Sequence, residues 1–113
     1  MAMLKGLLAA ALSLAAVGAA SGANAYPDKP VRVYVGFAPG GATDLLARLY
    51  AKKLGERFGQ TFIVENRPGA GGNIAVQALT QAPADGYTIA MAANYVAANA
   101  AMKRNPYDWE RDL

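Results

Sequence analysis

The stretch Val35-Gly36-Phe37-Ala38-Pro39-Gly40-Gly41-Ala42-Thr43-Asp44 decides the fold, because an apolar β-branched run ends there at glycines and an amphipathic pattern begins. We expect a strand, a tight turn and a helix N-terminus, in that order. Gly40 and Gly41 have no Cβ and can adopt positive φ, so a ligand atom can approach the backbone amides there. Thr43 or Asp44 can cap the helix by accepting one of its orphan N–H groups. The remaining N–H groups and the helix dipole favour an anion.

A second stretch repeats this arrangement. Residues 62–65 (FIVE) form an apolar run, which the loop Asn66-Arg67-Pro68-Gly69-Ala70-Gly71-Gly72-Asn73 and a short apolar segment follow. Asn73 can cap the helix that we expect there. Two helix N-termini side by side predict a cradle for a carboxylate or a phosphate.

The first 25 residues have the pattern of a secretory signal peptide. Lys5 precedes the uncharged run 6–23, and the segment ends in Ala23-Asn24-Ala25, which fits an A-x-A cleavage site. A membrane anchor is the alternative, but the run is rich in Ala and Gly and is short for a span. We therefore predict that residues 1–25 are removed, and that residues 26–113 act in the periplasm of a bacterium.

Composition narrows the function classes. A chain of 113 residues holds one small domain. Without Lys5, ten Lys and Arg residues face eight Asp and Glu residues and form no basic stripe, so nucleic acid is not an expected partner. The sequence contains no cysteine, so it offers no disulfide, no thiolate nucleophile and no Cys-ligated zinc.

The hydrophobic pattern predicts alternating strands and helices. We expect strands over 31–37, 61–65 and 87–92, and helices over 44–58, 73–82 and 96–102. The first helix has large apolar residues every four positions with two alanines beside them, and these form its expected buried face: Leu46, Tyr50, Leu54, Phe58, Ala47 and Ala51. Its solvated face is expected to carry Arg48, Lys52 and Glu56. The second helix is expected to turn Ile74, Ala75, Ala78 and Leu79 toward the sheet.

The order β-α-β-α-β-α predicts an α/β fold, as one part of a doubly wound parallel sheet with right-handed crossovers. In such sheets ligands bind beyond the carboxyl ends of the strands, near the point where the strand order reverses. Both glycine-rich loops follow strands, and Asn94 follows the third one. We therefore expect all three to meet at one site.

Five motifs carry a resemblance to a known family. They are Tyr26-Pro27-x-Lys29-Pro30, Phe37-x-Pro39-Gly40-Gly41-x-Thr43-Asp44, Val64-Glu65-Asn66-Arg67-Pro68-Gly69-Ala70-Gly71-Gly72-Asn73, Asp85-Gly86-Tyr87-Thr88 and Pro106-Tyr107-Asp108. In this order they resemble the Bug/TctC family, the extracytoplasmic solute receptors of tripartite tricarboxylate transporters. The resemblance covers residues 26–113.

The resemblance implies a periplasmic binding protein whose two α/β lobes close on a small carboxylated solute and deliver it to the membrane components of a transporter. It implies no enzymatic activity and no cofactor. Family members are longer, so the resemblance predicts that residues 26–113 are the N-terminal part of the first lobe, in a truncated reading frame or a fragment. Backbone amides of the first two strand-to-helix loops hold the ligand carboxylate in the family. Carried over by motif, the ligand-binding residues are Ala38, Gly40, Gly41, Ala42, Thr43, Asp44, Gly69, Ala70, Gly71, Gly72 and Asn73.

Some side chains in these loops have competing roles. Asn94 stands where relatives often have a Ser/Thr-His pair, and we include it among the ligand-binding residues. Asp44 fits a helix cap better than an anion contact, because a carboxylate repels a carboxylate; it could still accept a hydrogen bond from a ligand hydroxyl, an amine or a bridging water. Arg67 could be a counter-ion for the ligand. A solvated Arg67, or one paired with Glu65, is the alternative that we favour.

Other function classes fit the residues less well. A dinucleotide-binding fragment of an exported oxidoreductase is the main alternative, because Glu65 stands where such a domain has its acidic residue, but Gly36, Gly40 and Gly41 have the wrong spacing for G-x-G-x-x-G. Residues 26–113 contain no Ser, His or Cys, so the usual nucleophile and base pairs cannot form and no catalytic residue is expected. The alternating acids of segment 108–112 lack the remaining ligands of a calcium loop, so no metal site is expected. A purely structural module would leave both glycine-rich loops unexplained.

Overall fold

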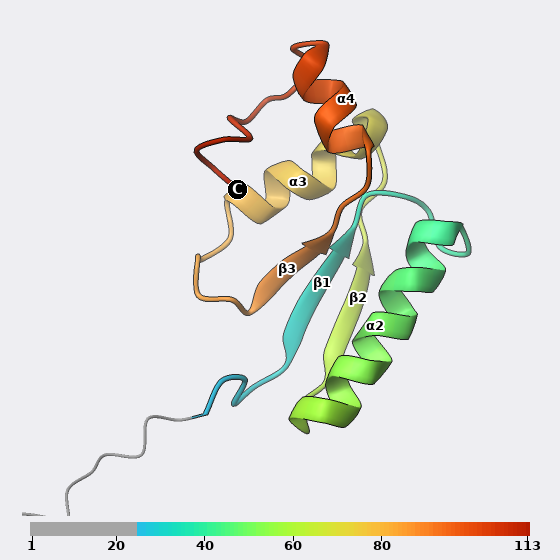
Figure 1. The fold of residues 1–113 in the computed structure, drawn as a ribbon, viewed down its shortest axis with the longest axis vertical. Helices are drawn as coiled ribbons and strands as arrows, with labels where there is room; N and C mark the ends of the chain where they lie inside the picture. The colour runs from blue at the N-terminus through green and yellow to red at the C-terminus, as the bar shows by residue number, and fades with distance from the viewer. Residues whose placement is uncertain (1–24) are drawn as a thin grey trace, which may run out of the picture.

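The computed structural model describes residues 25–113, which alternate between strands and helices as the pattern predicts (Figure 1). The elements are β1 (Val31–Val35), α2 (Ala42–Phe58), β2 (Phe62–Asn66), the 3-10 turn η2 (Ala70–Gly72), α3 (Asn73–Thr80), β3 (Thr88–Met91) and α4 (Tyr95–Ala101). Among the described helices, none has the length and apolar character that a bilayer crossing requires. Apart from residue 25, the predicted signal peptide lies outside the described residues.

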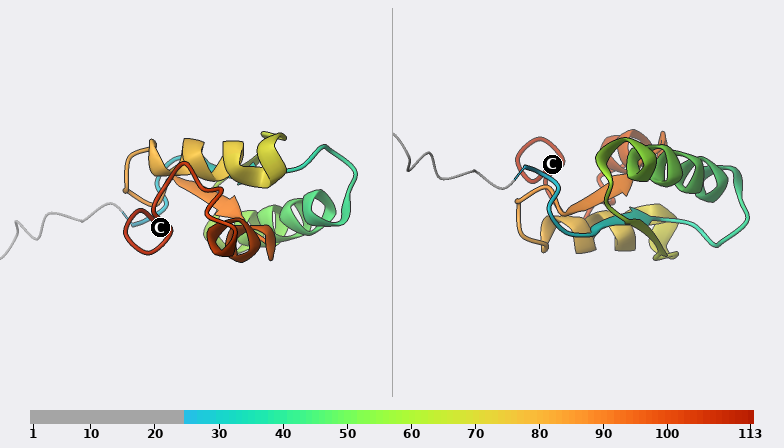
Figure 2. Two further views of the ribbon diagram at one scale, coloured as in Figure 1. Left: turned by 90° about the horizontal axis from the view of Figure 1, so that it is seen from above. Right: turned by 90° about the horizontal axis from the view of Figure 1, so that it is seen from below.

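The three strands form a parallel sheet in the order β2-β1-β3. In register, Val31 lies opposite Phe62, and Arg32 lies opposite Thr88. Figure 2 shows α3 on one side of the sheet and α2 on the other, as in a doubly wound fold. The chain moves from β1 outward to β2 and then crosses to β3 on the other side, so the strand order reverses between β1 and β3. The carboxyl ends of β1 and β3 therefore border the crevice where sheets of this kind bind ligands.

Apart from the exposed Arg32, the central strand β1 is apolar because helices cover both of its faces. Val31 and Val35 are fully buried, and Val33 and Tyr34 are nearly so. A strand that is buried on both faces reads as a continuous apolar run rather than as an alternating one. The strand ends at Val35, two residues earlier than predicted, and the buried Gly36 follows it.

Helix α2 packs on the sheet through small residues, which corrects the predicted buried face. Ala47 and Ala51 are buried, whereas Leu46 and Tyr50 are 50% and 56% exposed. Successive residues of an α-helix are about 100° apart around its axis, so a face centred on the alanines turns the neighbouring large side chains outward. The alanines also let the backbone of α2 approach the sheet closely.

The predicted buried face of α3 is also wrong at its first turn. Ala75 and Val76 are buried, but Ile74 is 46% exposed and does not face the sheet as predicted. A Cβ atom built on Gly69 would lie 2.5 Å from Cδ1 of Ile74, so the isoleucine side chain lies over the preceding loop. Ala78 and Leu79 are half-buried.

Two single substitutions at neighbouring positions test which face of α2 packs on the sheet. Ala47→Leu should destabilise the domain by about 1–3 kcal/mol, because the added carbons have no room against the sheet. Leu46→Ala should change the free energy of unfolding by only about 0.5 kcal/mol, since this side chain is half exposed. Urea unfolding followed by circular dichroism measures both. A larger cost for Leu46→Ala would mean that the leucine face is the one that packs.

Candidate functional site

The loop between β1 and α2 leaves the N-terminus of α2 open. Gly41 is the N-cap residue, and the helix begins at Ala42, two residues earlier than predicted. Gly40 has a φ of 94°, as expected, but Gly41 has a φ of −77° and an extended backbone, so only Gly40 requires a left-handed conformation. No side chain caps the helix, which makes the predicted capping by Thr43 or Asp44 wrong.

Asp44 instead anchors the loop through hydrogen bonds of its buried carboxylate. Its side chain is buried, and its carboxylate accepts hydrogen bonds from Nε of Arg48 at 3.0 Å, from the amide of Gly40 at 2.9 Å and from Nδ2 of Asn66 at 2.9 Å. These three donors come from α2, from the loop and from the end of β2. The guanidinium of Arg48, followed by the Gly40 amide and the Asn66 side chain, lowers the pKa of Asp44 to about 2.

Asn66 completes this network at the end of β2. Its Nδ2 also donates to the carbonyl of Phe37 at 3.0 Å, and its Oδ1 accepts from Arg48 at 3.2 Å. Side-chain hydrogen bonds therefore hold the loop between β1 and α2 against the end of β2. The sequence-based prediction placed Arg48 on a solvated face and gave Asn66 no role. The available signal was the spacing of Asp44 and Arg48, which is that of an ion pair on one helix face.

The amides at the start of α2 are free to bind. The first amide in this region that bonds to the backbone is that of Leu45, which donates to the carbonyl of Gly41 at 3.0 Å. None of the hydrogen bonds within residues 25–113 uses the N–H groups of Gly41, Ala42 or Thr43. Gly41 and Ala42 are exposed and Thr43 is half-buried. These donors stand at the positive end of a 17-residue helix, which is an arrangement that binds anions.

The second glycine-rich loop is folded more tightly. Gly69, Ala70, Gly71 and Gly72 all have positive φ, and the amide of Gly72 donates to the carbonyl of Gly69 at 3.0 Å. The N-cap residue of α3 is Gly72, so the prediction that Asn73 caps this helix is wrong. The first three residues of the loop remain exposed, whereas Gly72 and Asn73 are buried.

Side chains from α4 and from the segment after it cover this second corner. Nδ2 of Asn99 donates to the carbonyl of Gly71 at 3.1 Å and to Oδ1 of Asn73 at 3.0 Å. The Tyr107 hydroxyl lies 3.3 Å from the same Oδ1, and Nδ2 of Asn73 donates to the carbonyl of Arg104 at 2.8 Å. Asn73 is therefore engaged inside the domain, because its side chain holds the segment after α4 against α3.

The predicted residues lie at one end of the sheet but differ in their contacts. Both loops and Asn94 follow carboxyl ends of parallel strands, so they share this end of the sheet (Figure 1). Asn94 is exposed and precedes α4 without a capping side-chain bond. Where β1 ends, a Cβ atom on Gly36 would lie 3.0 Å from Cα of Gly72. Within the described residues, no hydrogen bond joins segment 38–43 to segment 69–73 or to Asn94.

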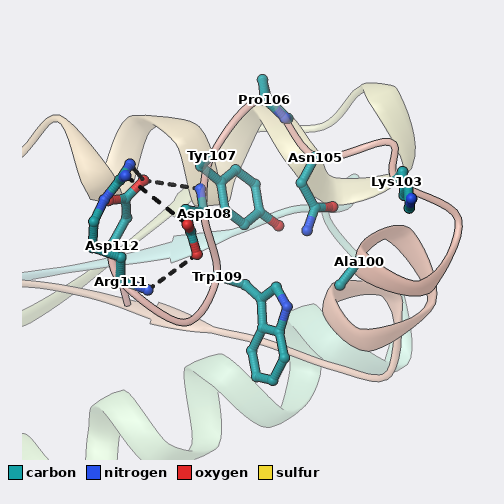
Figure 3. Close-up of a pocket in the computed structure, with 9 residues that line it drawn as sticks. All are labelled: Ala100, Lys103, Asn105, Pro106, Tyr107, Asp108, Trp109, Arg111 and Asp112. Carbon is teal, nitrogen blue, oxygen red and sulfur yellow. Dashed lines mark hydrogen bonds and ion pairs between the residues drawn. The ribbon is translucent and has the colours of Figure 1, made fainter.

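A separate cavity of about 520 Å³ lies against the end of α4 (Figure 3). Trp109 and Tyr107 line it together with a charged turn, in which Nε of Arg111 lies 2.8 Å from Oδ1 of Asp112 and the amide of Asp108 donates to Asp112. None of the predicted ligand-binding residues lines this cavity. Across residues 25–113, the His, Cys, Asp and Glu side chains form no group of three that could hold a metal ion.

Glu65 is occupied by two arginines, which weakens the dinucleotide alternative. Its carboxylate accepts two bonds from Arg32, at 2.7 and 2.8 Å, and one from Arg67 at 3.3 Å. The pKa of Glu65 is lowered, chiefly by the hydrogen bond from Arg32. The guanidinium of Arg67 also lies 4.3 Å from the centre of the Tyr34 ring. The predicted pairing of Arg67 with Glu65 is confirmed.

A parallel sheet with helices on both faces and open loops at its carboxyl ends defines part of an α/β ligand-binding domain. Residues 46–113 match the family described as tripartite tricarboxylate transporter family receptor, TctC, and the chain belongs to this family. Receptors of this family are periplasmic solute-binding proteins rather than enzymes. The resemblance to Bug/TctC receptors that the motifs carry is thereby confirmed.

Known relatives are similar over most of this chain. A UPF0065 protein of Bordetella bronchiseptica is 42% identical over 109 residues, which are 95% of this chain and 32% of that protein. The structure of a TctC solute-binding protein from Polaromonas matches with a TM-score of 0.70 and 30% identity, over 75% of this chain and 30% of that one. MatC of Rhodopseudomonas palustris, solved with bound malate, matches with a TM-score of 0.54 and 42% identity, over 57% and 22%. The chain thus spans about three tenths of the length of the curated relatives that it matches.

The hydrogen bonds of Asp44 predict an acid-sensitive fold. A carboxyl group whose pKa is lower in the folded state stabilises that state above its unfolded pKa, and this stabilisation is lost as the pH falls toward the folded pKa. The free energy of unfolding should therefore decrease between about pH 4 and about pH 2. Asp44→Asn should be less stable at pH 7 and should lose less stability over this range. Thermal melts across the pH range measure this effect.

The matched control is Glu56→Gln, which removes an exposed carboxylate from the same helix. Its melt at pH 7 should equal that of the unmodified chain. An Asp44→Asn variant with the full acid slope would show that other carboxyl groups cause the acid sensitivity.

Gly40 and Gly72, which both have positive φ, should differ in their tolerance of a side chain. A Cβ atom on Gly72 would lie 2.4 Å from the Tyr95 ring, whereas one on Gly40 meets no atom within 4 Å. Both substitutions to alanine carry the strain of positive φ, about 1–2 kcal/mol. Gly72→Ala should add roughly another 1–3 kcal/mol through overpacking. Equal losses in chemical denaturation would mean that Tyr95 does not pack on Gly72.

Proposed function

We propose that this chain supplies the N-terminal part of the first lobe of a periplasmic receptor that captures a small carboxylate for a tripartite tricarboxylate-type transporter. The observation that carries the proposal is that the amides of Gly41, Ala42 and Thr43 at the start of α2 have no hydrogen-bond partner within the described residues. Membership of the TctC family and the malate bound in MatC support it.

The chemistry of this site suits a carboxylate group rather than a particular acid. Two carboxylate oxygens can accept several N–H bonds at once, and the dipole of α2 adds a favourable field. Backbone donors recognise the geometry of the acid group and not the rest of the molecule. The Asp44 charge lies in the same first turn of α2, but Arg48 pairs with it and its two oxygens are already bonded. We infer that Asp44 holds the loop and does not contact the ligand directly.

The second corner has a smaller role in this proposal than the sequence predicted. We assign Gly69, Ala70 and Gly71, which are exposed, to the far side of the site together with Asn94. Gly72 and Asn73 support that side from within, because both are buried. Residues 1–25 would direct export, residues 26–113 would form the receptor part, and the membrane components of the transporter would receive the ligand. This proposal includes no catalytic step and no cofactor.

Gly41→Val should remove ligand binding and keep the fold. The valine Cβ would lie 3.9 Å from the nearest atom at an allowed φ, but its methyl groups would stand in front of the amides of Ala42 and Thr43. In titrations of the 15N-labelled 113-residue chain with succinate, we expect the amide signals of these two residues to shift in the unmodified chain and to stay unchanged in the variant.

Ala84→Val is the control, since Ala84 is exposed in the turn between α3 and β3, at the amino ends of the strands. It should bind as the unmodified chain does. Unchanged succinate binding by a folded Gly41→Val chain would contradict the proposed site.

A further inference from the structure

Tyr95 occupies the crevice where the strand order reverses. It is the first residue of α4 and follows β3 closely, so it lies beside the carboxyl ends of β1 and β3. Its side chain is buried, with 8% of the residue exposed. The ring stands edge to face with that of Phe37, with 5.2 Å between the ring centres and 85° between the planes. The crevice that a doubly wound sheet usually offers to a ligand is thus occupied by an aromatic side chain.

Two glycines create the room for this ring. A Cβ atom on Gly72 would lie 2.4 Å from Cε2 and 2.5 Å from Cδ2 of Tyr95, so the ring lies directly against the backbone there. A Cβ atom on Gly36 would lie 3.2 Å from the Tyr95 hydroxyl. The missing side chain makes space for Tyr95 at Gly72, and for Tyr95 together with the Gly72 backbone at Gly36.

The Tyr95 hydroxyl makes no contact within residues 25–113 that would require a tyrosine at this position. It is buried and has no hydrogen-bond partner within the described residues. Tyr107, whose hydroxyl bonds to Asn73, is the nearby titratable group, and burial raises the pKa of both phenols. A phenylalanine would fill the same space, so the bulk of the ring is the property that matters for the shape of the crevice.

We propose that Tyr95 determines ligand size by closing this crevice, so that an acid bound at the start of α2 cannot extend a bulky group inward between β1 and β3. This inference rests on the proposed function, because it needs the carboxylate at the amides of Gly41, Ala42 and Thr43. The wall that Tyr95 and Phe37 form is aromatic and carries no charge. A second polar group of the ligand must therefore point away from it. Tyr95 acts here as a specificity-determining residue.

The test compares a small acid with a bulky one that has no aromatic ring. Acetate and cyclohexylacetate are titrated separately into the 15N-labelled 113-residue chain and into its Tyr95→Ala and Tyr95→Phe variants. In the unmodified chain and in Tyr95→Phe, both acids should shift the signals of residues 41–43 and leave those of Gly36 and Gly72 in place. In Tyr95→Ala, cyclohexylacetate should also shift Gly36 and Gly72. Its affinity relative to acetate should rise roughly tenfold or more, because the opened crevice buries its apolar ring.

Two results would overturn the inference: shifts of Gly36 and Gly72 with cyclohexylacetate in the unmodified chain, or an unchanged affinity ratio in a folded Tyr95→Ala chain. If Tyr95→Ala lacks a dispersed spectrum, the unmodified chain and Tyr95→Phe still decide, because shifts at these glycines in either would contradict a closed crevice. A failure of the proposed function gives a different result, since neither acid would then shift residues 41–43 in any of the three chains.

Discussion

The buried carboxylate of Asp44 is the constraint on which the open end of α2 depends. It bonds to the amide of Gly40, to the side chain of Asn66 and to Arg48, and so joins a loop, a strand end and a helix. A loop between a strand and a helix has several backbone donors to satisfy. Asp44 satisfies the one that precedes the N-cap residue. The next three amides then have no hydrogen-bond partner inside the described domain, and this is the property that a carboxylate receptor needs.

The two glycine-rich corners look alike in sequence and differ in the fold. The first corner projects beyond the sheet, where the hydrogen bonds of Asp44 and Asn66 and the contact of Phe37 with Tyr95 hold it. The second lies under α4, where Tyr95 covers Gly72 and Asn99 bonds to Gly71. We propose that the first corner is a donor surface for a ligand, whereas the second is mainly a packing surface. The TctC family, to which the chain belongs, consists of periplasmic binding receptors.

The alternation of strands and helices could be predicted because each element has a strong local pattern, and parallel pairing follows from that alternation. The rotation of α2 could not, since an alanine face and a leucine face both fit the helical period and only packing on the sheet selects between them. The same holds for Asn73, which looked like a cap but bonds to Arg104, 31 residues further along the chain. The roles of Tyr95 and Asn66 also depend on contacts between distant parts of the sequence. Local propensity does not encode such contacts.

A crystal structure of the 113-residue chain grown with malate would test most directly where the acid binds. We predict a carboxylate oxygen within about 3 Å of the amide nitrogens of Ala42 and Thr43. Asp44 should still bond to Gly40 and Asn66 in that structure. An acid group bound instead at Gly71 and Gly72, or in the cavity beside Trp109, would contradict the assignment of the anion site to the start of α2.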